Sequence, residues 1–146
     1  MKDASEAAPW HIWVVGIFAA LFNFVGVFDF TMSMAQGASY QAGAGMTPEQ
    51  IAHYRQMPGW MTIVWAVGVF GAFLASILLL VRRRSALPVF ILSLAAFAVS
   101  LLYTYVLTNG GAVMGRQMAI VSAVIAGLLV LFSFYSWSMI RRGVLR

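Results

Sequence analysis

The fold is decided by the sequence WMTIVWAVGVFGAFLASILLLVRRRSALPVFILSLAAFAVSLLYTYVLT, residues 60–108. It contains two apolar runs, residues 60–81 and 86–108, which are separated by a short connection with three consecutive arginines. Each run has roughly the 20 residues that an α-helix needs to cross a hydrocarbon core. The pair therefore predicts a helical hairpin that spans a lipid bilayer twice.

Two more runs of the same kind lie on either side of this hairpin, at residues 10–28 and 118–140. Apolar residues make up 62% of the 146-residue chain and charged residues only 9%, which is too little charge for the surface of a soluble domain. We expect one all-α integral membrane domain over residues 1–146, an up-down bundle of four transmembrane helices. The helices are expected at about residues 10–30, 60–81, 86–108 and 116–140, with one long external loop at 31–59.

The cations predict the orientation of the bundle. Seven of the nine fall on one side of a four-span topology, namely Lys2, Arg82, Arg83, Arg84, Arg141, Arg142 and Arg146. The other side has only Arg55 and Arg116. Cytoplasmic loops carry the excess of Lys and Arg. We therefore expect a multi-pass membrane protein with both termini in the cytoplasm. Flanking cations of this kind are explained by lipid headgroups, so nucleic acid is not an expected partner.

The first apolar run has an alternative interpretation as a cleaved signal peptide, because Ser33-Met34-Ala35 has the small-x-small pattern of a cleavage site. Its flank carries Asp3 and Glu6 against Lys2, however, and a signal peptide begins with net positive charge. The run is also longer than a typical signal-peptide core. We therefore expect it to be a retained helix.

The external loop divides into two halves. Residues 36–45 are small and poor in packing groups, and we expect them to be flexible. In the second half, Thr47 is a good N-cap, Pro48 suits the first helical position and Gln50 completes a capping box. This pattern predicts a short amphipathic helix that lies on the interface or covers the bundle. It is expected to be a structural lid, with partner docking or gating as the alternative.

Small residues indicate where the helices pack, because membrane helices approach each other most closely at such positions. The expected packing positions are Gly16 and Gly26 on the first helix, and Gly68, Ala72 and Ala75 on the second. Asn23 lies on the same face as Gly16 and Gly26, and we expect it to donate a hydrogen bond to a neighbouring helix rather than to contact a substrate.

Polar residues at the external end are the remaining candidates for a site. Asp29 is expected to form a rim ion pair with Arg116, or with Arg55, and the alternative is a titrating carboxylate on a proton path. His53 and Glu49 are four residues apart in the amphipathic helix, and we expect them to form a surface pair. Two such ligands are too few for a metal site. His11 lies at the cytoplasmic edge, so haem or pigment ligation within the bilayer is not expected.

No further chemistry is indicated by motif. The chain has no cysteine, and it has no nucleotide-binding loop, zinc motif or Ser/His/Asp set. We expect no cofactor, no metal, no catalytic residue and no enzymatic activity.

The chain also resembles a family of small four-helix inner-membrane proteins from proteobacteria. The residues that carry the resemblance are PWHIWVVG at 9–16, Asn23, Phe28-Asp29, TPEQ at 47–50, Pro58-Gly59-Trp60 and RGVLR at 142–146. Members are mostly uncharacterised and are sometimes labelled as sugar transporters. The resemblance implies the four-helix fold and a location in the bacterial inner (cytoplasmic) membrane, and it assigns no functional residue.

Two classes of function remain after these exclusions. The first is a non-enzymatic accessory or assembly subunit that packs against a larger membrane complex. The second is a small transporter or channel that works as an oligomer, because four short helices barely enclose a solute path. The two halves of the chain show no internal similarity, and inverted repeats would have supported the transporter. The expected partners are the lipid bilayer and other membrane subunits or further copies of this chain.

Overall fold

A computed structural model describes residues 8–146 of the chain. Four helical segments are long and apolar enough to cross a membrane: Trp10–Gln36, Gly59–Leu80, Ala86–Leu107 and Gly110–Arg141. They correspond to α1 (Trp10–Gln36), α4 (Gly59–Leu80), α5 (Ala86–Leu102) with the π-helical turn η1 (Tyr103–Leu107), and α6 (Gly110–Arg141). Within the described residues there is no β-strand. The predicted all-α membrane bundle is confirmed.

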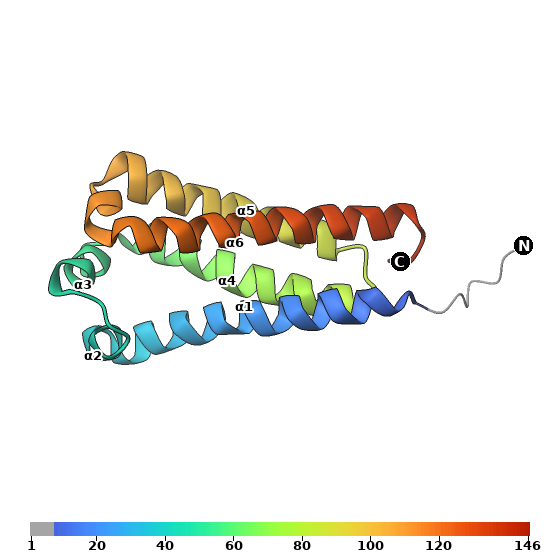
Figure 1. The fold of residues 1–146 in the computed structure, drawn as a ribbon, viewed down its shortest axis with the longest axis horizontal. Helices are drawn as coiled ribbons and strands as arrows, with labels where there is room; N and C mark the ends of the chain where they lie inside the picture. Colours follow the sequence, from blue (N-terminus) through green and yellow to red (C-terminus); the bar gives the residue numbers. More distant parts are fainter. Residues whose placement is uncertain (1–7) are drawn as a thin grey trace, which may run out of the picture.

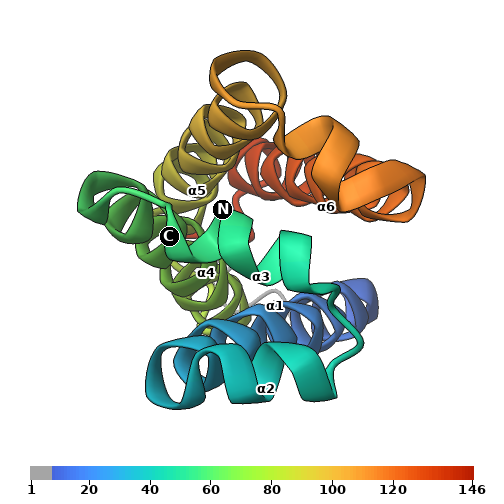
Figure 2. The same ribbon diagram turned by 90° about the vertical axis from the view of Figure 1, so that its left-hand side faces the viewer.

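The four long helices run antiparallel in chain order, and two short helices cover one end (Figure 1). α4 packs against both α1 and α5, and α5 packs against α6. The end with the short helices α2 (Ala38–Gly43) and α3 (Pro48–Arg55) is called the loop end below (Figure 2). The opposite end, with the Arg82–Arg84 turn and residues 141–146, is called the arginine end.

α1 and α4 pack through the small residues that the sequence indicated. A Cβ added at Gly16 would lie 2.5 Å from Leu80 Cδ2, and one at Gly26 would lie 3.4 Å from Val69 Cγ1. Ala72 and Ala75 are buried in this region of the bundle. Gly68 faces the other neighbour, α5, where Ser93 Oγ donates a 2.6 Å hydrogen bond to the Gly68 carbonyl. Small side chains at these positions allow the backbones to approach closely.

The first expected boundary is wrong, because α1 continues to Gln36 instead of ending near residue 30. Within its last two turns Thr31 Oγ1 donates to the Val27 carbonyl and Ser33 is buried. The helix ends at Gly37, where a φ of 56° suits glycine and the N–H donates to the Ser33 carbonyl.

The segment 36–45 is also more ordered than expected. Residues 38–43 form the short helix α2, and Gln41 on this helix is buried. The Gln41 carbonyl accepts a 3.1 Å hydrogen bond from the Met46 N–H. The segment therefore contains a short helix with the buried Gln41 where a flexible stretch was expected.

The fourth span begins six residues earlier than its expected start at 116. α6 starts at Gly110, and Gly115 interrupts it with φ 79° and ψ 179°. Such a backbone conformation favours glycine. The uninterrupted part of the helix therefore begins at Arg116, and the preceding turn is a separate short segment at the loop end.

At the arginine end, residues 144–146 pair with the α4–α5 turn. The Arg146 N–H donates to the Arg82 carbonyl and the Arg84 N–H donates to the Arg146 carbonyl, each at 2.9 Å. Arg82 Nε also donates to the Val144 carbonyl at 3.1 Å. Leu145 is only 2% exposed and belongs to the core that includes Phe90 and Phe132. This pairing fixes the end of α6 to the connection between α4 and α5.

Candidate functional site

The loop end is closed by α3, and Gln50 holds this helix in place. The predicted capping box is present: Gln50 N–H donates to Thr47 Oγ1, and Thr47 N–H donates to Gln50 Oε1. The Gln50 side-chain amide also donates, through Nε2, to the carbonyls of Val113 and Met114 at 3.4 and 3.3 Å. These carbonyls directly precede the break at Gly115, where the helical hydrogen-bond ladder is interrupted. One side chain thus caps α3 and satisfies the break in α6.

Replacing Gln50 with glutamate separates these two roles. Glutamate still accepts the Thr47 N–H but has no N–H to donate to the α6 carbonyls. We expect Gln50→Glu to keep α3 helical and to undock it from α6, at a cost of about 1 kcal/mol for the lost hydrogen bonds. Hydrogen exchange should be faster at the α3 amides, and Gln50→Ala should raise it further because the cap is also lost.

The matched control is Gln117→Glu, which makes the same change on an exposed side chain just after the break. It should leave α3 exchange unchanged. Equal exchange in Gln50→Glu and the unmodified protein would show that the contact with α6 does not hold the lid.

Aromatic rings form the underside of this lid. Tyr54 packs against Trp65 with ring centroids 5.7 Å apart, and Trp60 packs edge-on against Tyr103, also at 5.7 Å. His53 is half-buried against Gly110, where an added Cβ would lie 2.7 Å from His53 Cε1. Burial, and then the Asp29 carboxylate, raise the pKa of the Tyr54 phenol, so this ring stays neutral at physiological pH. The arrangement is that of a packed cover.

Packing against Gly110 therefore determines the position of the His53 side chain. Glu49 is exposed on the same helix, and no group of three or more His, Cys, Asp or Glu side chains near enough to hold a metal occurs within residues 8–146.

The expected ion pair of Asp29 with Arg116 or Arg55 is wrong. Asp29 Oδ1 accepts a 3.0 Å hydrogen bond from the Tyr40 hydroxyl, and no ion pair joins Asp29 to either arginine. The reason is the unexpected helix α2, which places Tyr40 beside the end of α1. Loss of hydration, and then this hydrogen bond, raise the pKa of Tyr40. Arg55 and Arg116 are both exposed.

Asn23 behaves as the sequence indicated. It is 7% exposed, and Nδ2 donates to Ser76 Oγ at 2.9 Å and to the Ala72 carbonyl at 3.4 Å. Ser76 Oγ in turn donates to the Ala72 carbonyl at 2.8 Å. The amide therefore joins α1 to α4 and is committed to helix packing.

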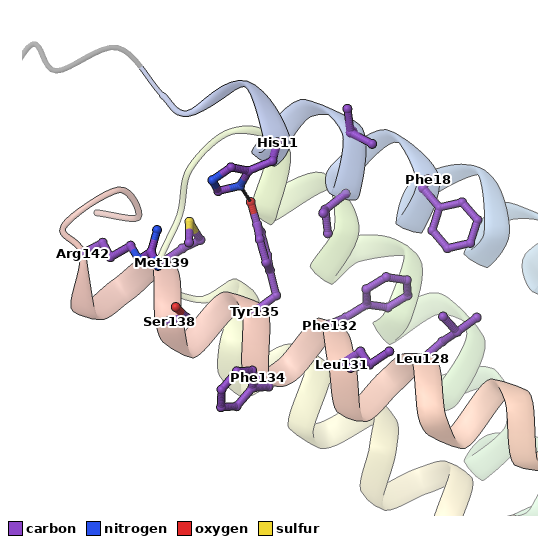
Figure 3. A pocket seen from close by; sticks show the side chains of 12 residues that line it. His11, Phe18, Leu128, Leu131, Phe132, Phe134, Tyr135, Ser138, Met139 and Arg142 are labelled. Carbon is purple, nitrogen blue, oxygen red and sulfur yellow. Dashed lines mark hydrogen bonds between the residues drawn. The ribbon is translucent and has the colours of Figure 1, made fainter.

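The structure adds a groove that the sequence did not predict. It lies between α1 and the second half of α6 near the arginine end and has a cavity volume of about 480 Å³ (Figure 3). Two contacts bridge it: His11 Nδ1 lies 2.6 Å from the Tyr135 hydroxyl, and the Phe18 and Phe132 rings are 6.2 Å apart. Arg142 and Ser138 lie beside the histidine, and apolar side chains line the remainder.

Sequence reasoning missed this groove because its two walls are separated by more than a hundred residues. His11 and Tyr135 are 124 positions apart, and no periodicity relates them. The only available signal was a histidine one residue inside an apolar helix, which is equally consistent with an interfacial position.

The candidate site is thus an open groove on one side of the helical bundle. It offers an apolar channel with hydrogen-bonding groups and a cation at one end, which is suited to binding. Comparison with known proteins adds no functional assignment, because no family model, no curated protein and no solved structure matches this chain.

Proposed function

We propose that this chain is a non-enzymatic accessory or assembly subunit of a larger inner-membrane complex. The observation that carries the proposal is a helix face without a neighbour. The outward side of α6 includes Ala123, Gly127 and Val130, and all three are exposed. α6 is also the least covered of the four spans, with only 11% of its most apolar window buried.

Gly127 is the residue on this face that favours a neighbouring helix. In the other spans, Gly16, Gly26, Gly68 and Gly71 each have a side chain of another helix within 4 Å of an added Cβ. Gly127 has nothing within 4 Å. Glycine in a helix costs about 1 kcal/mol relative to alanine. A neighbouring helix that packs closely against α6 would explain both Gly127 and its i, i+4 spacing from Ala123.

The polar groups inside the bundle favour a subunit over a transporter. Asn23 and Ser76 satisfy each other between α1 and α4, and Ser93 binds the Gly68 carbonyl between α4 and α5. Transport pathways in membranes are marked by ionisable groups that face a water-filled route. Asp29, the candidate for such a group, is exposed at the loop end.

The proposed orientation places the arginine end in the cytoplasm. Its support is the excess of arginine at that end, where residues 82–84, 141, 142 and 146 meet. A reporter that is active only outside the cytoplasm should be silent when it is fused after Arg146. Strong activity of this fusion would reverse the orientation.

Site-specific crosslinking in native membranes tests the accessory role. A photo-reactive residue at Ala123 should give a discrete adduct with another protein, and Gly127→Leu should remove most of it because a bulky side chain separates the two helices. The matched controls are a photo-reactive residue at Ala98, also exposed but on α5, and Ala98→Leu. The same adducts at both positions, or an adduct insensitive to Gly127→Leu, would refute a partner on this face.

The alternative, a small oligomeric transporter, gives different results in the same experiment. The adduct would then have twice the mass of the chain. Purified protein in vesicles would also show proton-coupled uptake that Asp29→Asn abolishes. We expect no such uptake. Uptake by the unmodified protein that is lost in Asp29→Asn would contradict the accessory-subunit proposal.

A further inference from the structure

The groove between α1 and α6 changes character along its length. At the arginine end it is lined by His11, Tyr135, Ser138 and Arg142. Towards the middle of the bundle its walls are apolar, with Phe18, Leu128 and Leu131 (Figure 3). A ligand that fits both parts must itself have a polar head and a long apolar tail.

The charge of the polar part specifies the head. Six arginines belong to the arginine end of the chain, at positions 82–84, 141, 142 and 146. The acidic residues in the described part of the chain are Asp29 and Glu49, and Asp29 binds Tyr40 at the loop end. Both side-chain carboxylates lie at the loop end, so neither pairs with Arg142 at the arginine end. An arginine with hydrogen-bonding neighbours at a membrane interface is suited to a phosphate group.

The dimensions of the groove argue against a protein helix as its occupant. An α-helix with its side chains is about 10–12 Å across. The walls of the groove are joined by the His11–Tyr135 hydrogen bond and by the Phe18–Phe132 ring contact, so the space between α1 and α6 is bridged at two levels. A cavity of about 480 Å³ falls in the size range of small-ligand sites. An extended acyl chain is narrow enough to lie beside these two contacts.

We propose that this groove is a binding site for one anionic phospholipid, with its phosphate at Arg142 and an acyl chain between α1 and α6. Ser138 and the His11–Tyr135 pair provide the polar contacts around the headgroup. The lining of the groove includes neither Ala123 nor Gly127, so the two proposals are tested with different residues. Basic pockets between transmembrane helices bind anionic headgroups in this way.

The neighbouring arginine offers a matched control. Arg141 and Arg142 are adjacent, and both are exposed. Arg142 lines the groove, whereas the Arg141 guanidinium stacks over Trp137 at 4.9 Å from the ring centroid and is not part of the lining. A diffuse attraction of lipid to the cationic end would depend equally on both, whereas a site depends on Arg142.

The experiment measures lipid retained by the full chain after extraction from vesicles of equal phosphatidylglycerol and phosphatidylcholine, using native mass spectrometry. The unmodified protein should retain one phosphatidylglycerol in preference to phosphatidylcholine. Arg142→Gln should reduce this retention about fivefold, whereas Arg142→Lys and Arg141→Gln should keep most of it. An equal loss in Arg141→Gln and Arg142→Gln would show diffuse attraction and overturn the site.

A second variant tests the acyl chain. Val14 is 57% exposed on the wall of the groove, so Val14→Trp fills the channel without entering the core. It should lower phosphatidylglycerol retention while the thermal unfolding midpoint in detergent stays unchanged. Soluble glycerol phosphate should fail to displace the lipid. Displacement by glycerol phosphate, or full retention in Val14→Trp, would show that only a phosphate is bound and would overturn the lipid site.

Discussion

Gly16→Leu should destabilise the bundle more than any other glycine substitution within the spans. An alanine Cβ at this position already lies 2.5 Å from Leu80 Cδ2 and 2.9 Å from Leu80 Cγ, so the whole Leu80 side chain must move. Overpacking of this kind costs about 1–3 kcal/mol, and leucine adds three further carbons to the clash. We expect a clear drop of the thermal unfolding midpoint in mild detergent and a lower yield of folded protein.

An alanine series at three glycines provides the control. Gly16→Ala should lower the midpoint, and Gly26→Ala should lower it less because its nearest atom, Val69 Cγ1, lies at 3.4 Å. Gly127→Ala meets no atom within 4 Å and should be neutral or stabilising, since alanine is the better helix former. The change from glycine to alanine would then lower the unfolding midpoint at Gly16 and leave it unchanged or raise it at Gly127. Equal effects at all three positions would contradict the observed packing of α1 on α4.

Asn23→Asp should produce the second large effect. Aspartate has nearly the same shape, but its ionised form cannot donate to Ser76 Oγ or to the Ala72 carbonyl, which are the observed partners. A carboxylate in the middle of a membrane helix costs about 2.5–3.5 kcal/mol on insertion scales. We expect the stability loss to be largest at neutral pH and to shrink as the pH falls, because the protonated carboxyl group regains an O–H donor.

Ser76→Ala serves as the companion variant. It removes one partner of Asn23 and leaves the Ala72 carbonyl in place, so its cost should be about 0.6 kcal/mol, the average for interhelical hydrogen bonds in membranes. It should show no such pH dependence. If Asn23→Asp unfolds at the same temperature at all pH values tested, the buried hydrogen bond from α1 to α4 is not present in the membrane.

The spans could be predicted from the sequence because they depend on local composition. Residues 60–81 and 86–108 were expected to be helical, and the structure has helix at Gly59–Leu80 and Ala86–Leu107. The capping box of Thr47 and Gln50 was also predictable, because its hydrogen bonds join residues three apart. The same holds for the small-residue face of Gly16 and Asn23, which a helical period alone defines.

Contacts between distant elements could not be predicted in this way. Asp29 had two arginines and a tyrosine as possible partners, and the choice of Tyr40 followed from a short helix that composition did not indicate. The groove depends on the contacts of α1 with α6 at His11–Tyr135 and Phe18–Phe132. Which residues of two helices meet depends on the rotation of each helix about its axis. The apolar pattern of the sequence does not determine that rotation.

The pairing of residues 144–146 with the Arg82–Arg84 turn has a consequence for biogenesis. Arg146 and Leu145 are translated after all four spans, so this contact forms only when the last helix has entered the membrane. Until then the turn between α4 and α5 lacks its hydrogen bonds to residues 144–146, and the core lacks Leu145. A bundle that lacks its last three residues therefore also lacks the hydrogen bonds that join the end of α6 to the α4–α5 turn.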